Sequence, residues 1–202
     1  TNVKHLVEDN AKLIDDIRAE LVANYKLNIS KNKLRIMNIH NLGQKLNHRL
    51  YNISLGKKFT NGFIRNNHDV LEISDRDFIK QNRTILFTNS YTKFQQYLLE
   101  SFKNYNPDLL FFGHTKNINL ETIDKFKNIN KNLIISQWNE DPVMPSLEYS
   151  RENIQNISHY NGYVDHNFIT TDPSVFSKQN SKIKNLHYFF IPVDPNIECF
   201  NV

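Results

Sequence analysis

The chain has 202 residues, 39% of them hydrophobic and 12% aromatic, which is enough for one sizeable core and not clearly enough for two domains. No apolar run approaches the ~20 residues that cross a membrane. The net charge of +4 comes from lysines scattered among acidic residues, so we expect a mildly basic surface and no nucleic-acid interface. The alternative for this charge is attraction to an anionic ligand or a membrane surface.

Cysteine content and the start of the chain bear on the compartment. The single cysteine, Cys199, excludes an intramolecular disulfide and any site built from several thiolates. No basic-then-apolar pattern of a secretory leader is visible in the sequence. These features predict a cytoplasmic location, with peripheral attachment to the membrane as the alternative.

The first predicted element is an amphipathic helix over residues 3–24. Its apolar positions recur at helical spacing: Val3, Leu6, Val7, Leu13, Ile14, Ile17 and Leu21. Asn10 lies seven residues from both Val3 and Ile17, where a coiled coil can use a buried asparagine to fix its register. The segment therefore predicts either self-association through residues 3–24 or a helix packed on its own domain. We divide the chain into this helix with its linker, residues 1–33, and a globular domain, residues 34–202.

The globular part alternates short apolar runs with helical patterns. Strands are predicted at 34–40, 69–73, 108–112, 133–138, 163–170 and 186–191. Helices are predicted at 53–66, at 90–105 with Ser90 as N-cap, at 120–129 and after Ser146, with a helical turn at 173–178. This alternation predicts an α/β fold with a doubly wound, mainly parallel, Rossmann-like sheet. The usual strand order for such a sheet is 3-2-1-4-5-6.

Several common chemistries are excluded by missing motifs. The turn after the first strand lacks G-x-G-x-x-G, and no P-loop or G-x-S-x-G elbow is present. No histidine pair is spaced like a zinc site on one helix. Asp75-Arg76-Asp77 matches the D-x-D pattern that holds a metal in some sugar transferases. Short acidic patterns are common by chance, so we interpret it as a solvated loop and expect neither a metal nor a cofactor.

The end of the fourth predicted strand carries the richest set of polar residues. Trp138 could offer a sugar a flat apolar face, and Asn139, Glu140 and Asp141 could bind hydroxyl groups or accept a proton. The alternative is that Asp141-Pro142 only opens a turn while Trp138 fills the edge of the core. Ligands of open parallel sheets bind at the carboxyl ends of strands, which favours a site here.

Other strand ends add weaker candidates. His114 follows the third strand, and an imidazole with its ordinary pKa near ~6.5 suits a general base. His40 ends the first strand, and Asn41 and Gly43 follow it in a polar loop. Thr171, after the fifth strand, either lines the same cleft or caps the next turn. The start of the predicted helix at Ser90 could bind an anion.

In four segments the chain resembles the N-terminal half of GT-B glycosyltransferases, particularly those like the spore-maturation protein CgeB. The segments begin with Asn106-Pro107-Asp108 and the apolar run to Gly113, and continue with the run from Ile134 to Asp141-Pro142. The third and fourth segments are residues 163–172 and the Pro192-Val193-Asp194-Pro195 signature after the last strand. The resemblance covers residues 33–200. It departs from many relatives in having only one glycine in the loop after the first strand.

This resemblance implies two Rossmann-like domains facing a cleft, with the acceptor bound by the first domain and the nucleotide-sugar donor mainly by the second. The chain then corresponds to the acceptor-side half, without the C-terminal donor domain, and we expect it to be inactive alone. The implied activity is hexosyl transfer to a hydroxyl of a glycan, protein or small molecule. Asp141, Glu140 and His114 are the candidate bases.

The candidate acceptor-binding residues form a larger set at the same strand ends. They are His40, Asn41, Gly43, Trp138, Asn139 and Thr171. The alternative function is a non-catalytic α/β binding or assembly module that oligomerises through its N-terminal helix.

Overall fold

The computed structural model describes residues 33–43, 53–83, 89–113, 115–144, 148, 150–174 and 183–198. The chain divides into two compact units, Thr1–Asn32 and Lys33–Val202. The amphipathic helix predicted at residues 3–24 lies outside the described residues, and so does His114. Everything below concerns the second unit.

A six-stranded sheet forms the centre of this unit, and every neighbouring pair of strands is parallel. The strands are β1 (Arg35–His40), β2 (Asp69–Ser74), β3 (Leu109–Phe112), β4 (Ile134–Asn139), β5 (His166–Ile169) and β6 (Leu186–Tyr188). The predicted α/β Rossmann-like fold is therefore confirmed. The adjacent, parallel arrangement expected for the third and fourth strands is also confirmed, with Leu109 opposite Ile134.

The predicted strand order is wrong in where it places the third strand. The observed order is β2-β1-β3-β4-β5-β6, so β3 pairs with β1 and β2 is an edge strand. Burial explains the difference. Residues 36–40 of β1 and 110–112 of β3 are buried, whereas β2 buries only Ile73 and carries Asp69 and Glu72. A strand with charged side chains is better placed at an edge than between two buried neighbours.

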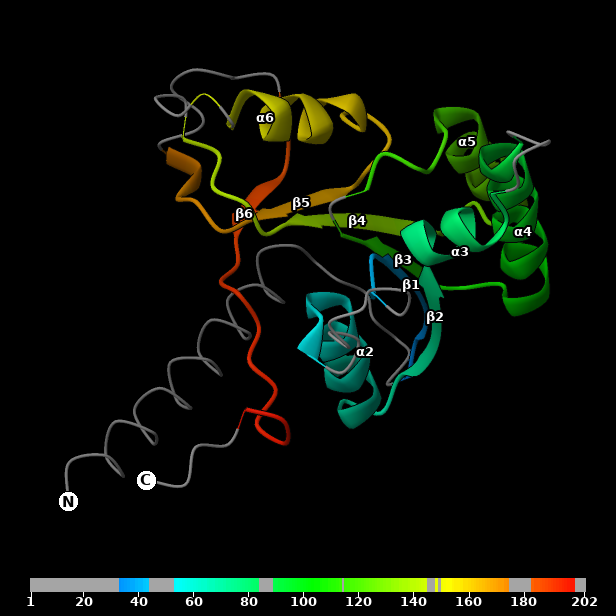
Figure 1. Cartoon of the computed structure of the whole chain (residues 1–202), viewed down its shortest axis with the longest axis horizontal. Coiled ribbons are helices and arrows are strands. Elements are labelled where there is room, and N and C mark those ends of the chain that lie inside the picture. The colour runs from blue at the N-terminus through cyan, green and yellow to red at the C-terminus, as the bar shows by residue number, and fades with distance from the viewer. Residues whose placement is uncertain are drawn as a thin grey trace. The chain divides into compact units, whose positions relative to one another are not determined.

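Helices cover both faces of the sheet (Figure 1). Helix α2 (Leu55–Arg65) packs on one face, where Phe59 meets Ile36, Phe111 and Trp138. The opposite face is covered by α3 (Asp75–Gln81), α4 (Ser90–Tyr105), α5 (Leu120–Ile129) and α6 (Ser150–His159). Because the chain crosses to the other face after β2, the connections diverge between β1 and β3, which is the switch point of the sheet.

The larger apolar core lies between the sheet and this second set of helices. Phe94, Leu98 and Phe102 of α4 follow one another at helical spacing and are fully buried. The Phe102 ring stacks on that of Phe126 from α5, with ring centroids 4.3 Å apart. The strong stripe of the α4 sequence therefore packs as expected.

Several element boundaries differ from the sequence prediction. Helix α3 was not predicted, because Asp75-Arg76-Asp77 was interpreted as a loop. The N-cap of α4 is Asn89 rather than Ser90. Strand β5 starts three residues later than predicted, since residues 161–163 form a turn. Of the helices described, none is long and apolar enough to cross a membrane.

Candidate functional site

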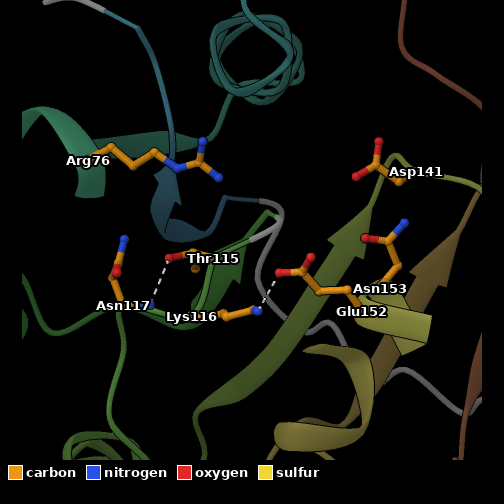
Figure 2. Close-up of a pocket in the computed structure, with 7 residues that line it drawn as sticks. All are labelled: Arg76, Thr115, Lys116, Asn117, Asp141, Glu152 and Asn153. Atoms are coloured by element: carbon orange, nitrogen blue, oxygen red, sulfur yellow. Dashed lines mark hydrogen bonds and ion pairs between the residues drawn. The ribbon is translucent and has the colours of Figure 1, made fainter. Parts of the chain in front are cut away.

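An open polar cavity of about 440 Å³ lies at the carboxyl edge of the sheet (Figure 2). Its lining residues are Arg76, Thr115, Lys116, Asn117, Asp141, Glu152 and Asn153. They come from the start of α3, the loop after β3, the loop after β4 and the first turn of α6. The volume falls within the range of small-molecule sites, and the position is where ligands of open parallel sheets bind.

Buried Asp75 organises one wall of the cavity. Its side chain has no exposed surface, and one carboxylate oxygen accepts hydrogen bonds from Thr115 Oγ1 at 2.5 Å and Asn117 Nδ2 at 2.8 Å. The backbone N–H of Asn117 donates to Thr115 Oγ1 at 3.1 Å, and Gln95 Nε2 donates to the Asn117 carbonyl at 2.6 Å. The loop that carries Lys116 is thereby fixed to α3 and α4.

The interpretation of the D-x-D pattern as a solvated loop is wrong. Asp75 and Asp77 are both buried in the first turn of α3. Acidic side chains are favourable there because the backbone N–H groups of a helix start carry partial positive charge. Asp77 accepts a short hydrogen bond from Ser74 Oγ, and Asp75 also accepts one from the backbone N–H of Arg76. The two carboxylates thus order the start of the helix and the neighbouring loop.

The loop after β4 forms the opposite wall and is held by side-chain hydrogen bonds. Asn139 Oδ1 accepts from the backbone N–H of Asp141 at 3.0 Å, and Thr170 Oγ1 donates to the Glu140 carbonyl at 2.9 Å. Thr171 Oγ1 accepts from the Val143 N–H at 3.0 Å, and Ser150 Oγ donates to the Pro142 carbonyl at 2.9 Å. Asn139 and Thr171, predicted to contact an acceptor, here position the loop that carries Asp141.

Charges of both signs face the cavity. Figure 2 shows Arg76 and Asp141 on opposite sides, with Lys116 and Glu152 between them. Lys116 Nζ lies 2.8 Å from Glu152 Oε1, in an ion pair exposed to solvent. Arg76 forms no ion pair within the described part of the chain. The cavity can therefore accept a ligand that has hydroxyl groups on one side and an anionic group on the other.

His40 lies at the switch point but faces the interior. It is 5% exposed, and burial lowers its pKa to about 3, so the ring is neutral at neutral pH. The ring lies 5.6 Å from that of Phe59 and 5.4 Å from that of Phe111. A Cβ on Gly113 would lie 2.2 Å from the His40 ring, so the glycine leaves space for it. Neither ring nitrogen has a hydrogen-bond partner among the described residues.

Trp138 does not offer a flat face to the cavity. It is 1% exposed, and its ring packs edge-on against Phe59 with centroids 4.8 Å apart. The void at this strand end, lined in part by Trp138 and Asn139, measures about 10 Å³, which is far too small for a sugar ring. Trp138 therefore belongs to the apolar core under α2 in this structure.

The remaining predicted residues are placed as follows. Asn41 is partly buried, and Gly43 is buried with φ of +69°, a backbone conformation that favours glycine. Neither lines the 440 Å³ cavity. Glu140 is partly buried beside Asp141. Of the six predicted acceptor-binding residues and the two predicted bases that the structure describes, only Asp141 lines this cavity.

Sequence reasoning missed most of the cavity wall. Thr115, Lys116 and Asn117 follow β3 directly, so the rule that ligands bind at carboxyl ends could have identified them. Arg76 was noticed only as the middle of an acidic triplet. Glu152 and Asn153 lie on a helix, and no signal in the sequence places that helix start beside β3.

Fold and cavity together define an α/β protein with a parallel sheet and an open polar cavity at its carboxyl edge. No family model matches the sequence, and no curated protein matches it. Among solved structures, similar chains include an alpha-glucosyltransferase in complex with UDP-glucose and DNA containing an abasic site. That match has a TM-score of 0.47 at 18% identity and covers 80% of this chain and 43% of the other.

Two further matches are alpha-glucosyltransferase complexes with UDP and a 13-mer DNA. The complex containing a HMU base has a TM-score of 0.48 at 15% identity, and covers 80% of this chain and 43% of the other. The complex with a central A:G mismatch has a TM-score of 0.43 at 16% identity, and covers 83% and 42%. This chain spans less than half the length of these proteins. Similarity at this level assigns neither an activity nor a substrate.

Proposed function

We propose that this chain is the acceptor-side half of a glycosyltransferase of the GT-B type. It would act with a donor-binding domain outside these 202 residues to move a sugar from a nucleotide-sugar to a hydroxyl acceptor. The proposal rests on one observation. The Asp141 carboxylate lies on a loop that is held by hydrogen bonds, beside an open cavity of about 440 Å³ at the carboxyl edge of a parallel sheet. The CgeB-like order of motifs along the chain supports it.

The hydrogen bonds around residues 139–143 support Asp141 as the catalytic base of the proposed reaction. A catalytic base must stay within hydrogen-bond reach of the proton it removes, so its loop needs a fixed position. The loop is fixed on one side by Asn139 and on the other by Thr170 and Thr171. Asp141 is thus the first candidate for the base, and Glu140 and His114 remain alternatives.

The proposed reaction is direct transfer. The carboxylate of Asp141 accepts the proton of the acceptor hydroxyl as its oxygen attacks the anomeric carbon of the donor. The bond from that carbon to the nucleoside diphosphate breaks, and the diphosphate leaves with the bonding electrons. Arg76 and Lys116, across the cavity, supply positive charge for an anionic group of either substrate.

The test measures sugar transfer in the natural protein that contains this chain, using a panel of nucleotide sugars and hydroxyl acceptors. We expect Asp141→Asn to lower kcat by about 10²–10⁴-fold, as loss of a general base does, and to leave donor KM unchanged. Asp124→Asn, the same change at an exposed position of α5, is the matched control.

Two results would redirect the assignment. Full activity of Asp141→Asn, Glu140→Gln and His114→Ala would remove all three residues as bases. Absence of transfer, with no nucleotide sugar or glycan raising the melting temperature, would favour a non-catalytic binding or assembly module.

A further inference from the structure

Two histidines from neighbouring strands meet on the α2 face of the sheet, away from the cavity. His166 is the first residue of β5 and His187 is the middle residue of β6. Phe168 is directly opposite His187 in the register, so His166 and His187 are diagonal neighbours on one face. His166 Nδ1 and His187 Nε2 form a hydrogen bond with a length of 3.2 Å, and both side chains are partly buried.

Side-chain amides hold the two strands together around this pair. The backbone N–H of Asn167 donates to the Asn185 carbonyl at 2.8 Å, and its side chain donates to the Lys184 carbonyl at 2.9 Å. In return, Asn185 Nδ2 donates to the Asp165 carbonyl at 2.8 Å. These hydrogen bonds hold the backbone segments that carry the two histidines, although β6 is only three residues long.

The spacing of the two nitrogens suits a shared metal ion. Imidazole nitrogens bind Zn²⁺ at about 2.0–2.1 Å, and two such bonds to atoms 3.2 Å apart enclose an angle of about 100°, near the tetrahedral value. Neutral imidazole is the form that binds a metal.

We propose that His166 and His187 form a cross-strand binding site for a divalent transition metal such as Zn²⁺ or Cu²⁺. Each imidazole contributes one nitrogen, with its proton on the other, and water completes the coordination. Metal binding therefore replaces the hydrogen bond between the rings, and one ring moves its proton from the shared side to its other nitrogen. Within the described residues, no group of three or more His, Cys, Asp or Glu side chains could hold a metal, so the described part of the chain supplies two protein ligands. Imidazole is a ligand that suits both metals.

The bound ion would fasten the edge strand β6 to the sheet. Segment 189–198, which follows β6, leads to Asp194, whose carboxylate accepts hydrogen bonds from Arg65 at 2.7 Å and Asn61 at 2.8 Å on α2. A metal at the β5–β6 pair would therefore stabilise the start of a segment that ends on α2. This role is separate from the chemistry proposed for the cavity.

The experiment adds one equivalent of CuCl₂ to the full chain and records the electron paramagnetic resonance spectrum. We expect superhyperfine splitting from two imidazole nitrogens in the wild type, reduced to one nitrogen or lost in His166→Asn and in His187→Asn. His159→Asn, at the exposed end of α6, is the control and should match the wild type.

A second measurement does not depend on copper. With ZnCl₂ in about 100-fold excess over its Kd, the wild-type melting temperature should rise by roughly 5 °C and return after chelation. Slower hydrogen exchange at β6 should accompany this rise. The proposal is overturned if the wild type shows no two-nitrogen copper signal, or if both variants bind copper and zinc as the wild type does.

Discussion

Replacing His40 by leucine should remove a specific part of the acid sensitivity of this fold. The folded-state pKa of His40 is about 3 because the ring is buried, whereas the pKa in an unfolded chain is about 6.5. Between these values the unfolded state binds a proton that the folded state does not. Stability therefore rises with pH across this window, and it is lost as the pH falls below about 6.5.

The size of the effect follows from the proton linkage. Each pH unit inside the window corresponds to about 1.4 kcal/mol. Lowering the pH from 7.5 to 4.5 crosses about two units of it, so His40 should cost the wild type about 2.7 kcal/mol of unfolding free energy. Leucine does not titrate. Since neither ring nitrogen of His40 has a partner among the described residues, the substitution breaks no hydrogen bond there.

Urea unfolding at both pH values measures the effect. The free energy lost between pH 7.5 and 4.5 should be smaller by about 2–3 kcal/mol in His40→Leu than in the wild type. Other groups titrate in both proteins and cancel in this comparison. His159→Leu, at an exposed position, is the control and should keep the wild-type loss. An equal loss in wild type and His40→Leu would refute the assignment of a buried, neutral His40.

Two further predictions concern packing and a buried carboxylate. Gly113→Ala should destabilise the fold by about 1–3 kcal/mol through contact with the His40 ring, and a His40→Ala background should relieve this loss. Gly62→Ala in α2, where no atom lies within 4 Å of the added Cβ, should instead stabilise by about 0.5–1 kcal/mol, and equal effects of the two glycine substitutions would contradict the packing argument. Asp194→Ala should cost about 1–3 kcal/mol in urea unfolding, because it removes a buried carboxylate that accepts hydrogen bonds from Arg65 and Asn61. A double-mutant cycle with Arg65→Ala that shows coupling below about 0.5 kcal/mol would disprove this.

The strands could be located from the sequence because local patterns of apolar residues indicate which segments are buried. The run ending at Phe112 is continuous and apolar, and residues 135–139 of β4 are buried, as in strands covered on both faces. The apolar stripe of α4 gave its limits directly. Helix α3 was missed because its first turn is acidic. Only the contacts of Asp75 with Thr115 and Asn117 explain why a buried carboxylate is stable there.

The candidate site was predicted less completely. Asp141 was identified because it ends an apolar strand, and the structure places it at an open cavity. The roles of Trp138 and His40 depend on which way each side chain faces, and both face the core under α2. Strand pairing and helix placement, which depend on distant residues, decide that direction.

The sequence by itself determined the class of fold and the edge of the sheet where the candidate cavity lies. Apolar periodicity and strand endings are local properties, because the residues that form each pattern lie close together in the sequence. The tertiary structure decided the strand order, the walls of the cavity and the meeting of His166 with His187. Those features depend on contacts between residues far apart in the chain, and such contacts leave no pattern within any one segment.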